Sequence, residues 1–313
     1  MDHLIEAQGL ERSFGDIKAV AGVDLVVAPG EIYGFLGPNG AGKSTTVRIL
    51  TTLLRPTGGR ATVAGFDVQS QANMVRRSIG VALQDAAIDP LMTGNELIRL
   101  QATLHGLRRK ETSRRGGELL ERVGLTEAAD RRVGTYSGGM RRRLDLALAL
   151  IHEPAVLFLD EPTTGLDPTS RMSLWDELRR LSSEGTTIFL TTQYLEEADE
   201  LAHRVAIIDG GVIVKEGSPN DLKLAVGSPT LRVDVAEHQL EIAGRVLNGF
   251  GETRPARQGR LAIGLDKGAG ELAKVVRGLD DQGVEVLHME LDAPSLDDVF
   301  AQATGRRLEG AAA

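Results

Sequence analysis

Eight consecutive residues form a glycine-rich loop of a kind that binds phosphate groups. They are Gly37, Pro38, Asn39, Gly40, Ala41, Gly42, Lys43 and Ser44. Glycines let successive backbone N–H groups turn towards phosphate oxygens, where side chains would obstruct them. Lys43 brings a positive charge to the β- and γ-phosphates of a nucleotide, the Ser44 hydroxyl can bind Mg²⁺, and Thr45 can donate to the α-phosphate. The spacing predicts a nucleotide site; the alternative is a chance glycine-rich turn.

Two adjacent carboxylates, Asp160 and Glu161, follow the apolar run at residues 156–159. Ligands of parallel sheets collect at the carboxyl ends of strands, so the pair should lie near the phosphate loop. Asp160 then fits the Mg²⁺ shell, and Glu161 fits a general base that polarises the attacking water. The alternative for the pair is an acidic loop after a core strand. Gln84 ends another apolar run and could reach Mg²⁺ or the water, although a single glutamine there is usually a loop residue.

A second anion cradle is predicted at residues 136–140, which open a helical pattern over residues 141–151. Ser137, Gly138 and Gly139 at a helix start leave backbone donors available to a phosphate group. One phosphate loop does not need a second phosphate site in its own chain. The simplest interpretation is that this cradle caps the γ-phosphate on a neighbouring subunit, and the alternative is an ordinary serine N-cap.

The elements that position these residues alternate between strands and helices from about residue 4 to residue 226. Strands are predicted at residues 23–27, 32–36, 79–83, 156–159 and 187–191, and helices at residues 45–54 and 171–181. The runs at 32–36 and 156–159 are apolar without alternation, as in strands buried on both faces. Residues 205–214 predict a hairpin with an Asp209-Gly210 turn of type I′. We therefore expect an α/β core with a mostly parallel sheet.

A second, smaller region follows a break at residues 227–229. Its strands are predicted at residues 231–235, 261–265 and 284–291, and its helices at residues 239–247, 271–282 and 296–304. The order βαβαβα indicates a small α+β accessory domain at residues 227–313, after a nucleotide-binding domain at residues 1–226. The accessory region carries no nucleotide or metal pattern, and we hypothesise that it stabilises a dimer or regulates activity.

Composition limits the classes of function. The 313 residues are enough for two modest domains, and the net charge of −8 with 4% aromatic residues argues against a broad nucleic-acid surface. Arginine runs at residues 108–110 and 141–143 are interpreted as solvated faces. The chain has no cysteine, which excludes disulfides and thiolate metal sites. No signal peptide is expected at the start, and no apolar run approaches the roughly 18 residues of a membrane span.

Taken together, these motifs resemble those of the ABC transporter ATPase family over roughly residues 4–226. The resemblance implies a P-loop NTPase fold of ABC type, class α/β, with a helical signature subdomain at about residues 88–150 and the small C-terminal α+β domain beyond it. Residues 136–140 resemble the signature motif, with Tyr and Met where Leu and Gln are often found. Residues 165–167 resemble the D-loop, which assigns Asp167 to the nucleotide site, and Gln84 resembles the Q-loop glutamine. Phe14 matches the aromatic residue that stacks on adenine.

One residue departs from the family pattern. The family usually places a histidine after the strand at residues 187–191, where it contacts the γ-phosphate, and here Gln193 occupies that position. A glutamine can hydrogen-bond a phosphate oxygen but cannot become cationic. The glutamine, together with Glu161 and the C-terminal region, resembles exporter ATPases of the daunorubicin/doxorubicin-resistance type. Residues 294–300 look like the end of those proteins.

The resemblance implies an ATP- and Mg²⁺-dependent ATPase that forms a head-to-tail dimer and drives a separate membrane permease. The expected place is the cytoplasmic face of the cell membrane, and the expected direction is export of a drug, lipid or other hydrophobic compound. One alternative is a soluble ABC-type ATPase acting on nucleic acid or ribosomes; the acidic charge and the single phosphate loop argue against it, and we expect no nucleic-acid partner. Another is a non-hydrolysing ATP sensor in which Gln193 marks lost activity.

Overall fold

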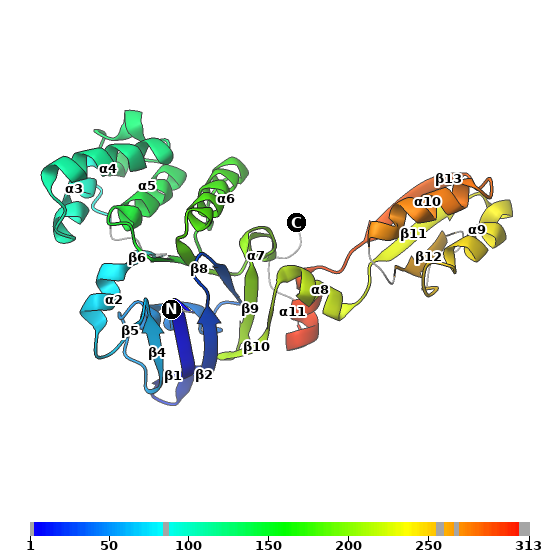
Figure 1. Ribbon diagram of the computed structural model, residues 1–313, viewed down its shortest axis with the longest axis horizontal. Helices are drawn as coiled ribbons and strands as arrows, with labels where there is room; N and C mark the ends of the chain where they lie inside the picture. Colours follow the sequence, from blue (N-terminus) through cyan, green and yellow to red (C-terminus); the bar gives the residue numbers. More distant parts are fainter. Residues whose placement is uncertain (1–2, 84–87, 255–259, 266–268, 307–313) are drawn as a thin grey trace. The chain divides into compact units, whose positions relative to one another are not determined.

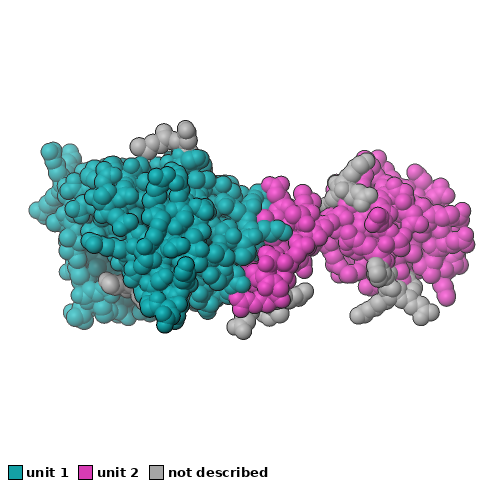
Figure 2. Space-filling view, turned by 90° about the horizontal axis from the view of Figure 1, so that it is seen from below, with its two compact units in different colours: residues 1–219, 308–313 teal, residues 220–307 magenta. Residues whose placement is uncertain are grey.

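The computed structural model describes residues 3–83, 88–254, 260–265 and 269–306. These residues form two compact units (Figure 2). Unit 1 runs to Pro219 and unit 2 begins at Asn220. This division falls seven residues before the boundary expected from the sequence, because helix α8 (Pro219–Val226) groups with the residues that follow it.

A six-stranded sheet forms the centre of unit 1 (Figure 1). Its strands, in spatial order, are β10 (Val212–Gly217), β9 (Arg204–Asp209), β3 (Ile32–Leu36), β8 (Thr187–Thr192), β7 (Val156–Asp160) and β6 (Ile79–Ala82). All neighbours are parallel except β10 and β9. The expectation of a mostly parallel sheet is confirmed. Every residue of β3 and β7 is buried, which explains why these two strands lack polar alternation.

Because β3, β6, β7 and β8 are parallel, their carboxyl ends meet at one edge of the sheet. Helix α1 (Lys43–Leu50) follows β3, α6 (Pro168–Ser183) follows β7 and α7 (Leu195–Leu201) follows β8. Helix α1 ends four residues earlier than predicted. Its continuation is blocked at Thr52, whose φ of 65° is not helical.

A second, antiparallel sheet was not anticipated from the sequence, apart from the run at residues 23–27, which lies in β2. Its strands, in order, are β2 (Ile17–Val27), β1 (Ile5–Phe14), β4 (Gly58–Val63) and β5 (Phe66–Asp67). Register shifts interrupt the β1–β2 and β1–β4 pairs, so no strict alternation marks β1 in the sequence. Ile5 of β1 and Phe35 of β3 belong to one apolar core, which this sheet shares with the central sheet and α1.

Helices gather on the chain between β6 and β7 (Figure 1). They are α3 (Gly94–Leu104), α4 (Arg109–Arg122), the 3₁₀ turns η1 (Thr126–Ala128) and η2 (Val133–Thr135), and α5 (Gly138–Leu150). Helix α2 (Ala72–Ser78) lies before β6. Helices α3, α4 and α5 pack against one another. They share an apolar core with β7 and α6, so the signature helix α5 is packed on the central sheet.

The hairpin predicted from residues 205–214 is present as β9 and β10, with a different turn. Asp209 pairs with Val212, so the two loop residues are Gly210 and Gly211 rather than Asp209 and Gly210. Both glycines have positive φ, 56° and 82°, as a type I′ turn requires. Glycine has no Cβ atom, so Gly210 and Gly211 adopt positive φ at less steric cost than a turn that includes Asp209 would require.

Unit 2 contains the strands and helices in the predicted order βαβαβα. They are β11 (Thr230–Val235), α9 (Leu240–Leu247), β12 (Arg260–Gly264), α10 (Leu272–Asp280), β13 (Val286–Asp292) and α11 (Leu296–Thr304), with 3₁₀ turns η3 (Glu237–Gln239) and η4 (Ala269–Glu271). The sheet order is β12-β11-β13 and both pairs are antiparallel. Leu231, Val275 and Leu279 lie in its apolar core.

Within the described ranges, no helix is long and apolar enough to cross a lipid bilayer. The same ranges hold no cluster of three or more histidine, cysteine or acidic residues that would ligate a metal ion by itself.

Candidate functional site

The phosphate loop lies between the carboxyl end of β3 and the start of α1. Gly42 is the N-cap of α1, in a left-handed conformation with φ 106°, and no side chain caps this helix start. A Cβ atom at Gly42 would lie 2.3 Å from the backbone oxygen of Ala19, and one at Gly37 would lie 2.4 Å from that of Ile208. Glycine is therefore required at both positions, and the uncapped N–H groups of α1 remain available to an anion.

Lys43 is buried in the first turn of α1, against its own loop. Its Nζ donates to the backbone oxygens of Gly37 (2.7 Å) and Pro38 (3.1 Å) and lies 3.5 Å from a carboxylate oxygen of Glu161. Burial lowers the pKa of the Lys43 ammonium group, and Glu161 and Asp160 oppose that shift. The structure thus brings the predicted phosphate-binding lysine and the predicted general base into one ion pair.

Ser44 and Asp160 supply the oxygen atoms that would bind a metal ion. The Ser44 hydroxyl donates to Asp160 over 3.3 Å, and Thr191 of β8 donates to the same carboxylate. A hydroxyl beside a carboxylate is the hard-oxygen pair that Mg²⁺ prefers. The residues fit the ion. Thr191 was missed from the sequence, because a threonine in a buried strand gives no local signal of its partner.

Glu161 follows β7 and is held in a strained backbone conformation. Its φ is 48°, which is uncommon for a residue with a side chain. Its N–H donates to the Thr191 backbone oxygen (3.1 Å), and the Thr164 hydroxyl donates to its carboxylate (3.4 Å). The side chain is buried at 8% exposure. Strain held in place by neighbouring contacts is typical of functional sites.

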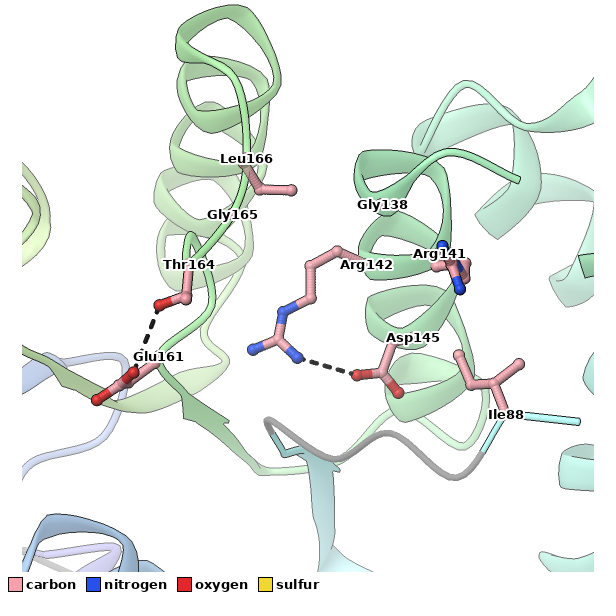
Figure 3. Close-up of a pocket in the computed structure, with 9 residues that line it drawn as sticks. All are labelled: Ile88, Gly138, Arg141, Arg142, Asp145, Glu161, Thr164, Gly165 and Leu166. Atoms are coloured by element: carbon pink, nitrogen blue, oxygen red, sulfur yellow. Dashed lines mark hydrogen bonds and ion pairs between the residues drawn. The ribbon is translucent and has the colours of Figure 1, made fainter. Parts of the chain in front are cut away.

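A cavity of about 290 Å³ opens between residues 161–166, which follow β7, and the signature helix α5 (Figure 3). Its lining includes Glu161, Thr164 and Gly165 on one side and Gly138, Arg142 and Asp145 on the other. Residues about twenty positions apart in the sequence therefore face each other across one space.

The signature turn begins α5 with a side-chain cap. The Ser137 hydroxyl accepts from the Met140 N–H over 3.2 Å, as an ordinary N-cap does. Tyr136 is buried, and its hydroxyl donates to the Ala128 backbone oxygen over 2.6 Å. The tyrosine that replaces the usual leucine therefore anchors the turn to η1, while Gly138 and Gly139 open the helix.

The remaining predicted site residues have varied surroundings. Asp167 is the N-cap of α6 and accepts from the Ser170 N–H (3.0 Å) and hydroxyl (2.7 Å), which lower its pKa. Phe14 ends β1, is 47% exposed, and stacks under Arg12. Gln193 follows β8 and is half-buried. Gln84 lies outside the described residues.

The interpretation of residues 141–143 as a solvated arginine face is wrong for two of the three. Arg141 is exposed, but Arg142 and Arg143 are half-buried. Arg142 donates to three backbone oxygens and pairs with Asp145 over 3.3 Å, and Arg143 donates to the Val123 backbone oxygen over 2.8 Å. Helical periodicity turns these two side chains inward, towards acceptors that lie far away in the sequence.

Two buried ionisable groups near the site, Asp145 and Glu197, were also missed, as was the half-buried His152 elsewhere in unit 1. Burial raises the pKa of the Asp145 carboxyl to about 6, against the lowering effect of Arg142. Glu197 in α7 is fully buried, accepts from the Trp175 indole N–H over 3.4 Å, and has its pKa raised by burial. His152 stacks on His105 with ring centroids 3.7 Å apart, and burial lowers the His152 pKa to about 4.

Comparisons with known proteins place this geometry in a family. The family model described as ABC transporter matches residues 20–164. The chain is 47% identical to the daunorubicin resistance ATP-binding protein DrrA2 of Streptomyces coeruleorubidus, over 98% of the chain and 97% of that protein. It is 41% identical to the doxorubicin resistance ATP-binding protein DrrA of Mycobacterium tuberculosis, over 97% and 94%. It is 37% identical to the Nod factor export ATP-binding protein I of a Rhizobium species, over 97% and 98%.

Solved structures agree with these relatives. The ATP-binding subunit of an ABC transporter superposes with a TM-score of 0.66 at 27% identity, over 71% of this chain and 92% of that one. A bacterial ABC transporter cassette described as dimeric gives 0.64 at 26% identity, over 68% and 98%.

The fold and the nucleotide motifs define an ATP-hydrolysing P-loop protein of the ABC class. The chain belongs to the ABC transporter family, as one of its ATP-binding subunits. Over nearly its whole length it is similar to daunorubicin and doxorubicin resistance ATP-binding proteins. Subunits of this class form dimers and pair with a membrane permease. Nothing in the comparisons favours an ATPase acting on nucleic acid or ribosomes.

Proposed function

We propose that this subunit powers export of a hydrophobic organic compound through a separate permease, from the cytoplasmic face of the membrane. Relatives that match the chain over nearly its full length are named for resistance to daunorubicin, doxorubicin or linearmycin, or for Nod factor export. Export is part of the Nod factor protein's name, and export of an organic compound would also account for drug resistance. The cargo-binding surface belongs to the permease, so this chain supplies the driving force rather than the specificity.

The first test is purification of the tagged chain from detergent-solubilised native membranes, with co-purifying proteins identified by mass spectrometry. We expect a multi-helix membrane protein in about equal amount. Recovery of the chain without such a protein, or with ribosomal proteins or nucleic acid, would contradict the permease partnership.

The proposed active form is a head-to-tail dimer with two ATP molecules between the subunits. The observation that supports this arrangement is that two different helices, α1 and α5, begin in glycine-containing turns, at Gly42 and at Ser137-Gly138-Gly139. Each ATP would contact Lys43 and its loop in one chain and Ser137, Gly138 and Gly139 in the other. Asp167 would border the same interface, and Phe14 would stack on adenine.

Within each site, the residues have distinct proposed tasks. Ser44 and Asp160, which are already within hydrogen-bond distance, would hold Mg²⁺ together with Gln84. Bound Mg²⁺ would offset the charge of the phosphate oxygens. Glu161 would accept a proton from the attacking water. Lys43 would exchange its present contacts with Gly37 and Pro38 for phosphate oxygens. Gln193 would hydrogen-bond the γ-phosphate in its neutral form.

Substitution of the general base tests the dimer directly. Glu161→Gln keeps the shape of the side chain but removes the base, so turnover should fall by about 10² to 10⁴. ATP binding should persist, and the variant should elute as a dimer with MgATP and as a monomer without it in size-exclusion chromatography with light scattering. Wild-type turnover by Glu161→Gln would overturn the base assignment, and a variant that binds ATP but stays monomeric would overturn the sandwich.

The sensor alternative is tested by phosphate release. Steady-state release by the wild-type chain that is lost in Lys43→Ala would exclude a non-hydrolysing sensor. Gln193→Ala should lower turnover without abolishing it, since Glu161 remains. Gln193→His, which keeps a hydrogen-bonding side chain at this position, should turn over faster than Gln193→Ala.

Unit 2 is proposed to stabilise the dimer or regulate turnover. Deletion of residues 228–313 should then weaken ATP-dependent dimerisation or change the rate of phosphate release. An unchanged dimer and an unchanged rate would leave unit 2 without either task.

A further inference from the structure

Arg142 joins the signature helix to the catalytic strands. Its guanidinium group donates to the backbone oxygen of Leu83 at the end of β6 (3.0 Å), of Asp160 at the end of β7 (2.9 Å) and of Pro162 just beyond it (3.0 Å). The same group pairs with Asp145, one turn along α5, over 3.3 Å. One side chain thus links α5 with the main chain of two strand ends.

Two of these acceptors lie on either side of Glu161. Asp160 and Pro162 are its sequence neighbours, and Figure 3 shows the Arg142 guanidinium between Glu161 and Asp145. Because Glu161 has a φ of 48°, its backbone would relax to a more populated conformation if the flanking peptides were released. Such a relaxation would displace the carboxylate, and a displacement of about 1 Å can cost about a hundredfold in rate.

The chemistry of arginine suits this task. A guanidinium group has five donors in a planar fork, so it can serve three backbone oxygens and a carboxylate at once. Lysine carries the same charge at a single point and cannot span these acceptors. Asp145 neutralises part of the charge that Arg142 brings into a half-buried position.

We propose that Arg142 is a positioning residue for ATP hydrolysis, which fixes the main chain on both sides of Glu161 within its own chain. The inference rests on the proposed task of Glu161 as general base. Arg142 acts through Glu161, so its loss should affect the chemical step and spare the binding of ATP.

The test compares two substitutions of Arg142 with one of its neighbour. Arg142→Met keeps an unbranched apolar stem and removes every donor, and kcat should fall ten- to a hundredfold while KM for ATP changes less than about twofold. Arg142→Lys keeps the charge and should recover only part of kcat. Arg143→Met is the matched control, because Arg143 lies on the same helix but donates to Val123, away from the acids; its kcat should stay within about twofold of the wild type.

The outcomes separate positioning from folding. Circular dichroism and the affinity for a fluorescent ATP analogue should be unchanged in Arg142→Lys, which keeps that variant informative if Arg142→Met does not fold. Wild-type kcat in Arg142→Lys, or an equal loss in Arg143→Met, would overturn the proposal. A rise in KM with unchanged kcat would also overturn it.

Mixed dimers show in which chain Arg142 acts. A small amount of a chain with intact Glu161 is mixed, before ATP is added, with a large excess of Glu161→Gln chains, so that nearly every dimer containing an intact Glu161 has only one active site. Arg142→Met in the chain with intact Glu161 should lower turnover as in the homodimer, and in the Glu161→Gln chain it should leave turnover nearly unchanged. The reverse result would mean that Arg142 acts through the signature turn on the partner's site, and would overturn the proposal. Failure of Glu161→Gln to dimerise with ATP contradicts the proposed dimer alone, since the single-variant kinetics still test Arg142.

Discussion

Unit 1 and unit 2 bury different kinds of side chains. Unit 1 buries five charged side chains, Lys43, Asp145, Asp160, Glu161 and Glu197, among its described residues. In the part of unit 2 that the structure describes, every buried side chain is apolar. Its ion pairs, such as Arg260 with Asp234 at 2.9 Å, remain partly exposed.

This difference indicates that the buried charges of unit 1 serve the nucleotide site, whereas the buried side chains of unit 2 serve stability. Buried charges carry a desolvation cost, which is accepted in unit 1 where carboxylates and a lysine must meet a nucleotide. Unit 2 has an ordinary apolar core, and substitutions of its core residues should change stability but not ATP turnover. Four predictions test whether the two units differ in this way.

The largest effect is expected from paired lysine substitutions. Lys43→Met should lower ATP turnover about a thousandfold, or about 4 kcal/mol in the barrier, because the β- and γ-phosphates lose their cation. Lys274→Met, at an exposed position of α10 in unit 2, should leave turnover unchanged. Both variants are compared with the wild type by their rates of phosphate release and their affinities for ATP. Comparable losses in the two variants would remove the contrast between the units.

Next in size are paired core substitutions. Leu279 in unit 2 and Leu178 in unit 1 are both fully buried, and replacing either by alanine should cost about 3 kcal/mol through lost burial and a residual cavity. Calorimetry with and without MgATP assigns the transitions, since ATP stabilises the unit that binds it. Leu279→Ala should lower a transition that does not respond to ATP. A shift of the ATP-sensitive transition instead would show that the units unfold together.

The dependence of stability on pH should come from unit 1. The pKa of Asp145 is raised to about 6 by burial, so the folded chain keeps a proton that the unfolded chain loses, and this group lowers stability as pH rises from 4 to 6. The pKa of His152 is lowered to about 4, so its contribution rises with pH between 4 and 6.5. Asp145→Asn and His152→Gln should therefore change the slope of stability against pH in opposite directions, each by up to about 1.4 kcal/mol per pH unit.

Denaturant unfolding at several pH values measures this slope. Within the described part of unit 2 no ionisable side chain is buried, so its transition should show little dependence over the same range. A slope unaffected by both substitutions would contradict the burial argument.

The smallest effect concerns two serine N-caps, one at the start of α5 and one at the start of α11. Ser137 accepts from the Met140 N–H and Ser295 from the Asp298 N–H, both over 3.2 Å. Replacement of either by alanine should cost about 1 kcal/mol of stability. Only Ser137→Ala should also lower ATP turnover, because only that hydroxyl belongs to the proposed composite site. Equal turnover in the two variants would mean that Ser137 acts only as a helix cap and does not belong to the composite site.

The sequence by itself determined the features that depend on neighbours along the chain. The phosphate loop needs glycines, Lys43 and Ser44 in fixed order, since the backbone there must curl around an anion. The buried runs of β3 and β7 and the βαβαβα order of unit 2 follow from local hydrophobic pattern. For the same reason the hairpin was found but its turn was placed one residue early, as element boundaries depend on pairing.

Only the tertiary structure decided which distant groups meet. Thr191 reaches the carboxylate of Asp160, and Arg142 turns from a surface run into a link with Leu83, 59 residues away. The antiparallel sheet of β1 and β4 joins segments that carry no regular alternation, because bulges interrupt their register. The contact of Arg142 with Leu83 leaves no pattern in a single sequence, since its acceptor is a backbone oxygen, which every residue carries, and the fold alone selects which of them lie within reach.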